Sequence, residues 1–260
     1  MVFDVRDGGP QGGEVVVLLH GFPQDASSWQ DVEPLLHGAG LRTLAPDQRG
    51  YSPGASPTAT GAYRLEELVG DVVAVIDAAG ADRVHLVGHD WGGAAAWAVA
   101  TRHPARVASL TVLSTPHPAA FARALRTLGQ LRKSWYMGAF QVPRLPELLL
   151  AGRVGALLRR QGVPAAERYG RRFATADSLR GPIGWYRANA GLGGAIFRDP
   201  VVVPTTYVWG SRDAALGRTG AELTAHHVEG DYRFVELDAD HWLPEKEAQR
   251  VADEVIRRAR

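Results

Sequence analysis

The chain has 260 residues, of which 45% are hydrophobic and 22% are charged, so it can bury a core as one large domain or as a core with an inserted lobe. This composition excludes collagen, coiled coils and wholesale disorder. The 29 basic and 28 acidic residues lack the basic excess of a nucleic-acid-binding protein. The absence of cysteine excludes disulfides, thiolate nucleophiles and zinc sites with cysteine ligands. No signal-peptide pattern opens the chain, and no uncharged apolar run approaches ~18 residues, so we expect a cytoplasmic protein without membrane insertion.

Short apolar segments and helical patterns alternate over the first 115 residues. The first apolar segment reads Val-Val-Val-Leu-Leu, which is typical of a strand buried on both faces. The predicted strands are residues 15–19, 41–45, 84–87 and 107–113, and the predicted helices are residues 65–76, 92–101 and a segment from Ser27 or Ser28 to Leu36. This alternation predicts a parallel sheet with helices on both faces. Little chain precedes the first glycine-rich turn, so the number of N-terminal strands stays open.

The alternation stops between about residues 116 and 203, a segment that we call the lobe. It reads as helical and irregular, and it holds 14 of the 29 basic residues but only 4 of the 28 acidic ones. Its arginines can form an ordinary solvated face whose aliphatic stems cover apolar surface, or they can favour acidic substrates or a membrane surface. Strand patterns resume at residues 205–209 and 233–237, and a closing helix is predicted over residues 245–258.

The pentapeptide Gly88-His89-Asp90-Trp91-Gly92 is the most informative motif. An isolated Gly-x-Asp-x-Gly is usually a plain turn, but this one lies between a predicted strand and a predicted helix. A nucleophile elbow is such a strand-to-helix turn, and it needs small residues two before and two after its tip because the backbone approaches closely. Both flanks here are glycine, and the helix N-terminus stabilises the Asp90 anion at the tip. The motif therefore predicts a carboxylate nucleophile, which is suited to displacement at an sp³ carbon.

This elbow and the turn His20-Gly21-Phe22-Pro23 resemble the α/β-hydrolase superfamily, in particular its bacterial soluble epoxide hydrolases, over nearly the whole chain. The resemblance implies an α/β-hydrolase fold, with a mostly parallel sheet flanked by helices and an inserted helical cap domain. The core would be residues 1–115 and 204–260, and the cap residues 116–203. It also implies a cis Phe22-Pro23 bond and an oxyanion hole made by the backbone N–H groups of Phe22 and Trp91. His20 and His89 would have structural roles.

The resemblance also assigns the other two members of a catalytic triad. His241, in Asp238-Ala239-Asp240-His241-Trp242, follows the last predicted strand and would be the general base. Asp213, in Gly210-Ser211-Arg212-Asp213, matches the loop that carries the orienting acid. Some relatives place this acid after the preceding strand, where this chain has Ser114-Thr115.

Two motifs in the lobe resemble the cap tyrosines of epoxide hydrolases. Ser134-Trp135-Tyr136-Met137 gives Tyr136, and Gly184-Trp185-Tyr186-Arg187 gives Tyr186. A phenol with an ordinary pKa near ~10 stays protonated at neutral pH and can donate to the epoxide oxygen. Either Trp-Tyr pair alone could be core packing, but two in one lobe favour a functional role. Tyr169 lies in an arginine-rich stretch and is therefore expected at the protein surface.

The expected reaction is the conversion of an apolar or aromatic epoxide and water to a vicinal diol through a hydroxyalkyl ester of Asp90, without a cofactor or a metal. Trp135, Phe140, Trp185 and Trp242 are predicted to line the substrate pocket, and His226-His227 is read as a helix-end surface. A haloalkane dehalogenase is the alternative enzyme, although position 22 is not the halide-binding Asn of many dehalogenases. A non-catalytic ligand-binding protein of the same fold is the third hypothesis.

Overall fold

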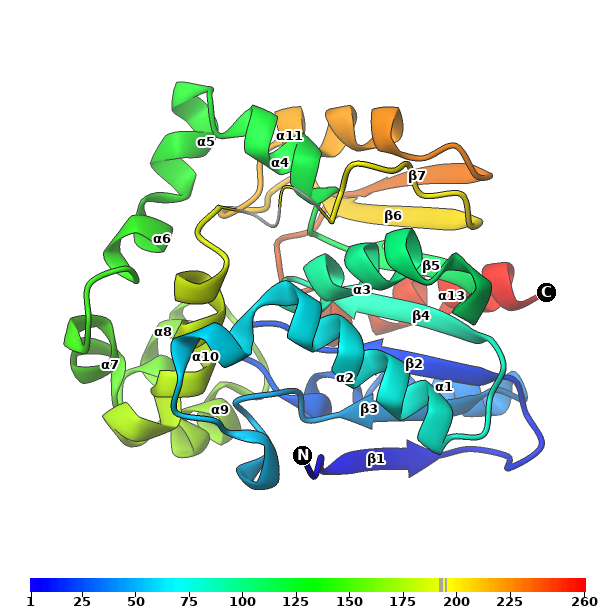
Figure 1. Ribbon diagram of the computed structural model, residues 1–260, viewed down its shortest axis with the longest axis horizontal. Coiled ribbons are helices and arrows are strands. Elements are labelled where there is room, and N and C mark those ends of the chain that lie inside the picture. The colour runs from blue at the N-terminus through cyan, green and yellow to red at the C-terminus, as the bar shows by residue number, and fades with distance from the viewer. Residues whose placement is uncertain (192–193, 195) are drawn as a thin grey trace.

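The computed structural model describes residues 1–191, 194 and 196–260. Its centre is a seven-stranded sheet with the strand order β1-β3-β2-β4-β5-β6-β7 (Figure 1). The strands are β1 (Val5–Gly8), β2 (Val15–Leu19), β3 (Arg42–Pro46), β4 (Val84–His89), β5 (Val107–Leu113), β6 (Thr205–Gly210) and β7 (Tyr232–Leu237). β1 pairs with β3 in the antiparallel sense and every other pairing is parallel. The predicted mostly parallel sheet is confirmed, and the short N-terminal stretch contributes one edge strand.

Helices cover both faces of the sheet, which explains the unbroken apolar pattern of β2. Val17 and Leu19 belong to one hydrophobic cluster with α2 and α3, whereas Val16 and Leu18 belong to a second cluster with α1 and α13. The helices outside the lobe are α1 (Glu33–Gly38), α2 (Leu65–Ala78), α3 (Trp91–Arg102), α11 (Arg218–Leu223), α12 (Leu243–Lys246) and α13 (Ala248–Ala259). Short 3₁₀ helices are η1 (Ala26–Trp29), η2 (Pro53–Ala55), η3 (Thr60–Tyr63), η4 (Pro104–Arg106) and η5 (Thr224–His227).

Two predicted helices are each divided in the structure. The segment predicted from Ser27 or Ser28 to Leu36 forms η1, capped by the Asp25 side chain, and then α1. Pro34 lies in the first turn of α1, where a residue without an N–H is tolerated, and it could not continue a helix that began at Ser28. The closing helix is likewise split into α12 and α13, because Glu247 has non-helical φ and ψ angles of −127° and 33°.

The lobe follows β5 and precedes β6, and its described part is helical. Its helices are α4 (Pro118–Ala124), α5 (Leu128–Lys133), α6 (Trp135–Ala139), α7 (Leu145–Leu150), α8 (Val154–Arg160), α9 (Ala166–Arg172) and α10 (Ala176–Ala188). α4 packs against α11, while α5, α6 and α7 follow one another along one outer edge of the molecule (Figure 1). None of the helices within the described residues is long and apolar enough to span a membrane.

Candidate active site

Asp90 lies at the turn between β4 and α3, in the strained backbone conformation that the elbow motif predicts. Its φ and ψ angles are 51° and −120°, in a region that residues other than glycine rarely adopt. A Cβ atom on Gly92 would lie 2.2 Å from the carbonyl oxygen of Leu19, and one on Gly88 would lie 2.3 Å from that of Gly92. The turn therefore excludes any larger residue at either flank.

The Asp90 carboxylate is held by the turn that follows β2. The backbone N–H of Phe22 donates to Oδ1 of Asp90 at 2.8 Å, and the Phe22–Pro23 peptide bond is cis. Gly21 allows this approach, since a Cβ atom there would lie 2.3 Å from Cβ of Asp90. The N–H of Trp91, the second predicted oxyanion donor, begins α3 and so has no acceptor inside the helix. Both donors border the carboxylate, but within residues 1–191, 194 and 196–260 only the Phe22 bond to it is formed.

His241 connects the two carboxylates, one on each side of its ring. Its Nδ1 lies 2.7 Å from Oδ2 of Asp213, and its Nε2 lies 3.6 Å from Oδ2 of Asp90. Oδ1 of Asp213 accepts the backbone N–H groups of Ala215 and Leu216 at 2.7 and 2.9 Å, which fixes the acid in its loop. The structure thus brings the three predicted triad residues together.

The two carboxylates raise the pKa of the imidazole, and the imidazole lowers the pKa of Asp90. Burial works against the charged imidazolium, but the charges of Asp213 and Asp90 and the hydrogen bond to Asp213 raise the pKa of His241 to about 10. Burial also works to raise the pKa of Asp90, yet the nearby charge of His241 and the hydrogen bond from the Phe22 N–H lower it overall. These interactions favour the protonated imidazole in the free protein.

Neighbouring polar groups hold the His241 loop in place. Nε2 of His89 lies 2.8 Å from the carbonyl oxygen of His241, and the Ser114 hydroxyl donates to the same oxygen at 2.9 Å. Nε2 of His20 accepts the backbone N–H of Gln48 at 3.1 Å. His20 and His89 therefore make structural hydrogen bonds away from the reacting carboxylate. Some relatives carry the orienting acid at the position of Ser114, but here the Ser114 hydroxyl stabilises the His241 loop as a hydrogen-bond donor.

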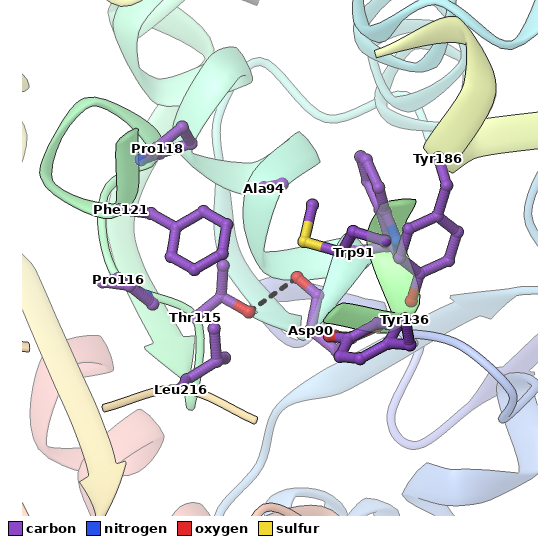
Figure 2. A pocket seen from close by; sticks show the side chains of 11 residues that line it. Asp90, Trp91, Ala94, Thr115, Pro116, Pro118, Phe121, Tyr136, Tyr186 and Leu216 are labelled. Carbon is purple, nitrogen blue, oxygen red and sulfur yellow. Dashed lines mark hydrogen bonds between the residues drawn. The ribbon is translucent and has the colours of Figure 1, made fainter. Parts of the chain in front are cut away.

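A narrow cavity of about 60 Å³ lies above Asp90 (Figure 2). It is lined by Asp90, Trp91, Ala94, Thr115, Pro116, Pro118, Phe121, Tyr136, Met137, Tyr186 and Leu216. Asp90 is the one charged residue of this lining, which is otherwise largely apolar. Figure 2 shows the rings of Tyr136, Tyr186 and Trp91 on one side of Asp90, and Phe121, Pro116 and Pro118 on the other. An apolar molecule that enters this cavity therefore meets a buried carboxylate.

The two tyrosines lie together at the cavity. Their ring centroids are 6.1 Å apart, and the Tyr186 ring is 5.0 Å from that of Trp91. Burial and the nearby Asp90 charge raise the pKa of both phenols above the ordinary range, so they remain donors at neutral pH. Among the described residues, neither hydroxyl donates to a protein acceptor. Both are free to donate to a ligand.

None of the four predicted pocket residues is part of the cavity lining, and they differ in position. Phe140 packs behind the tyrosines, with its ring centroid 4.8 Å from that of Tyr186. Trp185 is fully buried and donates to the Arg49 carbonyl oxygen at 2.8 Å, so it belongs to the core. Trp242 is also buried, and its ring packs 5.1 Å from that of His241.

Trp135 does not line the cavity, which corrects the prediction. Its side chain is 71% exposed. Adjacent residues of a helix point about 100° apart, so a helix that turns Tyr136 and Met137 toward the cavity directs Trp135 elsewhere. The Trp-Tyr motif located the helix correctly, but it could not tell which of the two rings faces inward.

Sequence reasoning missed a contact between the lobe and the loop that carries Asp213. Gln130 of α5 is buried; its Nε2 donates to the Ala215 carbonyl oxygen at 2.7 Å and its Oε1 accepts the Gly217 N–H at 2.8 Å. Lys133, one turn later, donates to the carbonyl oxygen of Asp213. Nothing in the sequence distinguishes Gln130, since its partners are backbone groups some 85 residues away in the chain.

Of two further predictions about surface residues, the one for Tyr169 is wrong, and the one for His226-His227 holds for the exposed His226 at the end of η5 but not fully for His227. Tyr169 is fully buried, and its hydroxyl donates to Oε1 of Glu245 at 2.9 Å. His227 is partly buried and stacks on His117, with the ring centroids 4.5 Å apart. Within the described part of the chain no group of three or more His, Asp or Glu side chains could hold a metal ion.

Comparison with known proteins agrees with this geometry. Residues 14–147 match the family model described as the alpha/beta hydrolase fold. The chain is 31% identical to the AB hydrolase superfamily protein YfhM of Bacillus subtilis (92% of this chain, 87% of the relative), and 31% identical to Epoxide hydrolase A of Mycobacterium tuberculosis (93% and 89%). The crystal structure of Epoxide Hydrolase A from Mycobacterium thermoresistibile is 28% identical and superposes with a TM-score of 0.85 over 98% of this chain and 93% of that one. The chain therefore belongs to the α/β-hydrolase fold family, among the relatives that are named epoxide hydrolases.

Proposed function

We propose that this protein is an epoxide hydrolase, which converts an epoxide and water to a vicinal diol through an ester of Asp90. The observation that carries the proposal is the meeting, in a single apolar cavity, of one largely buried carboxylate and two phenols without protein acceptors among the described residues. A carboxylate can attack an sp³ carbon, and the phenols supply the protons that a strained ether oxygen needs as its ring opens. Relatives named epoxide hydrolases that align with most of this chain support the same substrate class.

In the first step the hydroxyls of Tyr136 and Tyr186 donate to the epoxide oxygen. Asp90 attacks a ring carbon from the opposite side, the C–O bond of the ring breaks, and one phenol gives its proton to the released oxygen. The products are a hydroxyalkyl ester of Asp90 and a phenolate. The apolar lining excludes water at this stage and keeps the carboxylate reactive.

The second step hydrolyses the ester, and the pKa of His241 explains why it follows the first. Asp90 loses its negative charge on alkylation, which removes one of the carboxylates that raise the pKa of His241. The ring can then release its proton to the phenolate and act as a base, oriented by Asp213. It takes a proton from water, which attacks Cγ of Asp90 while the Phe22 N–H, with that of Trp91, stabilises the oxyanion. The collapse of this intermediate releases the diol and restores the carboxylate.

The function is tested with a panel of terminal and aryl-substituted epoxides and matched bromoalkanes, with diol and bromide as products. We expect diols from epoxides and little bromide release. The variant His241→Gln should stop after the first step, so its intact mass should rise by the mass of the epoxide. Asp90→Asn is the matched control and should gain no mass. If the wild type forms no diol from any epoxide and releases bromide instead, the protein is a dehalogenase. If it turns over neither class, it is a binding protein.

A further inference from the structure

The outer edge of the lobe exposes large apolar side chains. Six of them on α5, α6 and α7 are between 50% and 71% exposed: Leu128, Leu131, Trp135, Leu145, Leu148 and Leu149. These helices follow one another along one side of the molecule (Figure 1). We call this surface the outer face. Single exposed leucines are common, but six large exposed apolar side chains on three consecutive helices are typical of a surface that binds a partner.

The chain segment that carries the outer face is strongly basic. Residues 118–160, from α4 to α8, hold eight of the 29 basic residues and one of the 28 acidic ones, so this segment carries +7 and the rest of the chain −6. The acidic residue, Glu147, is buried and paired with Arg187. Arg126, Arg132 and Arg144 are exposed, and none has an ion pair among residues that the structure describes. The charge of the chain is thus uneven, with the positive excess in the segment that carries the outer face.

We propose that the outer face binds the surface of a membrane that contains anionic phospholipids. The arginines would contact lipid phosphates, and Trp135 and the leucines would insert at the boundary of headgroups and acyl chains. A second copy is disfavoured as the occupant, because its outer face would bring a second +7 segment against the first. A nucleic acid would use the arginines but would leave the leucines exposed.

The position of the outer face relative to the cavity adds a consequence. The short helix α6 carries Trp135 on the outer face, while Tyr136 and Met137 line the cavity. A bound membrane would therefore lie against the helix that forms one wall of the cavity. Binding itself does not depend on what the cavity does, so it is measured separately from catalysis.

The test is flotation of the purified full chain with vesicles of phosphatidylcholine alone or mixed with phosphatidylglycerol. We expect flotation with the mixed vesicles only, and we expect it to weaken as salt is added. The variant R126E/R132E/R144E should bind at least about 100-fold more weakly, since each basic residue contributes about fivefold in partition to an anionic surface. The variant W135S/L148S should lose at least about tenfold.

Control variants separate this surface from a general charge effect. R64E/R102E/R250E replaces three exposed arginines elsewhere, with the same change in total charge, and should float like the wild type. V202S removes an exposed apolar side chain that is not on the outer face. Circular dichroism verifies that each variant is folded. Absence of flotation with the mixed vesicles would overturn the proposal, as would equal loss in the control arginine variant. If W135S/L148S floats normally, or if it instead converts a wild-type dimer to a monomer without lipid binding, the outer face does not insert into membranes.

Discussion

Nε2 of His241 lies 3.6 Å from Oδ2 of Asp90, which is longer than a hydrogen bond but close enough for strong electrostatic coupling. Because Asp213 is bonded to the other nitrogen of the ring, the imidazole has a carboxylate on each side. Asp213 and His241 are buried and the Asp90 side chain is only 16% exposed, so water screens their charges weakly. This arrangement makes the protonation of His241 dependent on the state of Asp90, and it gives the folded protein a pH dependence that can be measured.

The first prediction is that the free energy of unfolding falls as the pH rises from about 6.5 to about 10. The folded-state pKa of His241, about 10, lies above its unfolded value of 6.5, so the native state binds the proton more tightly. The resulting stabilisation is complete below about pH 6.5 and is lost as the pH passes through the folded pKa. His241→Gln should flatten this part of the profile, measured by urea denaturation across the range. The exposed substitution His103→Gln is the control, and a slope that H241Q leaves unchanged would contradict the prediction.

The second prediction concerns the phenols. Tyr136→Phe and Tyr186→Phe should each lower kcat/KM for epoxides by about 10²-fold or more, the usual contribution of a positioned acid, and the double variant should have no measurable ring opening. Neither hydroxyl donates to a protein acceptor in the described structure, so its removal orphans no buried acceptor and stability should change little. Tyr232→Phe on β7, outside the cavity, is the control. Full activity of the double variant would remove the role assigned to these residues.

The sheet was predictable from sequence because each of its central strands is a short apolar run. Helices on both faces demand side chains such as those of Val15–Leu19, and the strand bounds agree with the prediction within about two residues. The elbow was predictable for a related reason. A Cβ atom on either flanking glycine would lie 2.2 or 2.3 Å from a backbone carbonyl oxygen, so only glycine fits there. This steric requirement is visible as a motif in the sequence.

Contacts that depend on how the lobe packs onto the core could not be predicted from the sequence. Trp135 and Trp185 stand in nearly identical motifs, yet one is 71% exposed and the other is fully buried. Tyr169 has arginines on both sides in sequence, but it bonds to a buried carboxylate from α12. These outcomes are decided by tertiary packing, which local residue type does not encode. A sequence motif therefore located the helices of the lobe better than it identified their inward faces.

The third prediction treats Gln130 as a positioning residue. Its two bonds to backbone groups at Ala215 and Gly217 hold the loop that orients Asp213 and, through it, His241. Gln130→Ala should cost about 1–3 kcal/mol of stability, because buried backbone groups lose their partners. If Gln130 had only a structural role, the variant would lose stability without any specific change in catalysis. We also expect kcat to fall more than KM rises, with the ester of Asp90 accumulating during turnover, as measured by intact mass. Gln249→Ala, on the surface of α13, is the control, and a Gln130→Ala variant that is destabilised without any accumulated ester would contradict the positioning role.

A buried carboxylate at the junction of lobe and core provides the last prediction. Gln24 Nε2 donates to both oxygens of Glu245 at 2.7 and 2.6 Å, and the Tyr169 hydroxyl donates to Oε1. Burial nevertheless raises the pKa of Glu245 to about 7, from an ordinary value of 4.5. Ionisation is therefore harder in the folded state, and this group makes the protein less stable as the pH rises from about 4.5 to about 7.

Glu245→Gln should remove that penalty, because the amide stays neutral at every pH. Its NH₂ group can donate to Oε1 of Gln24, which has no partner in the described structure, while its oxygen accepts from Tyr169. At about pH 8 the variant should be more stable than the wild type by on the order of 1–3 kcal/mol, and at about pH 4.5 the difference should vanish. Urea denaturation at the two pH values checks this, with the exposed substitution Glu229→Gln as control. A variant that is less stable at both values would show that the ionised carboxylate, held by Gln24 and Tyr169, stabilises the junction instead.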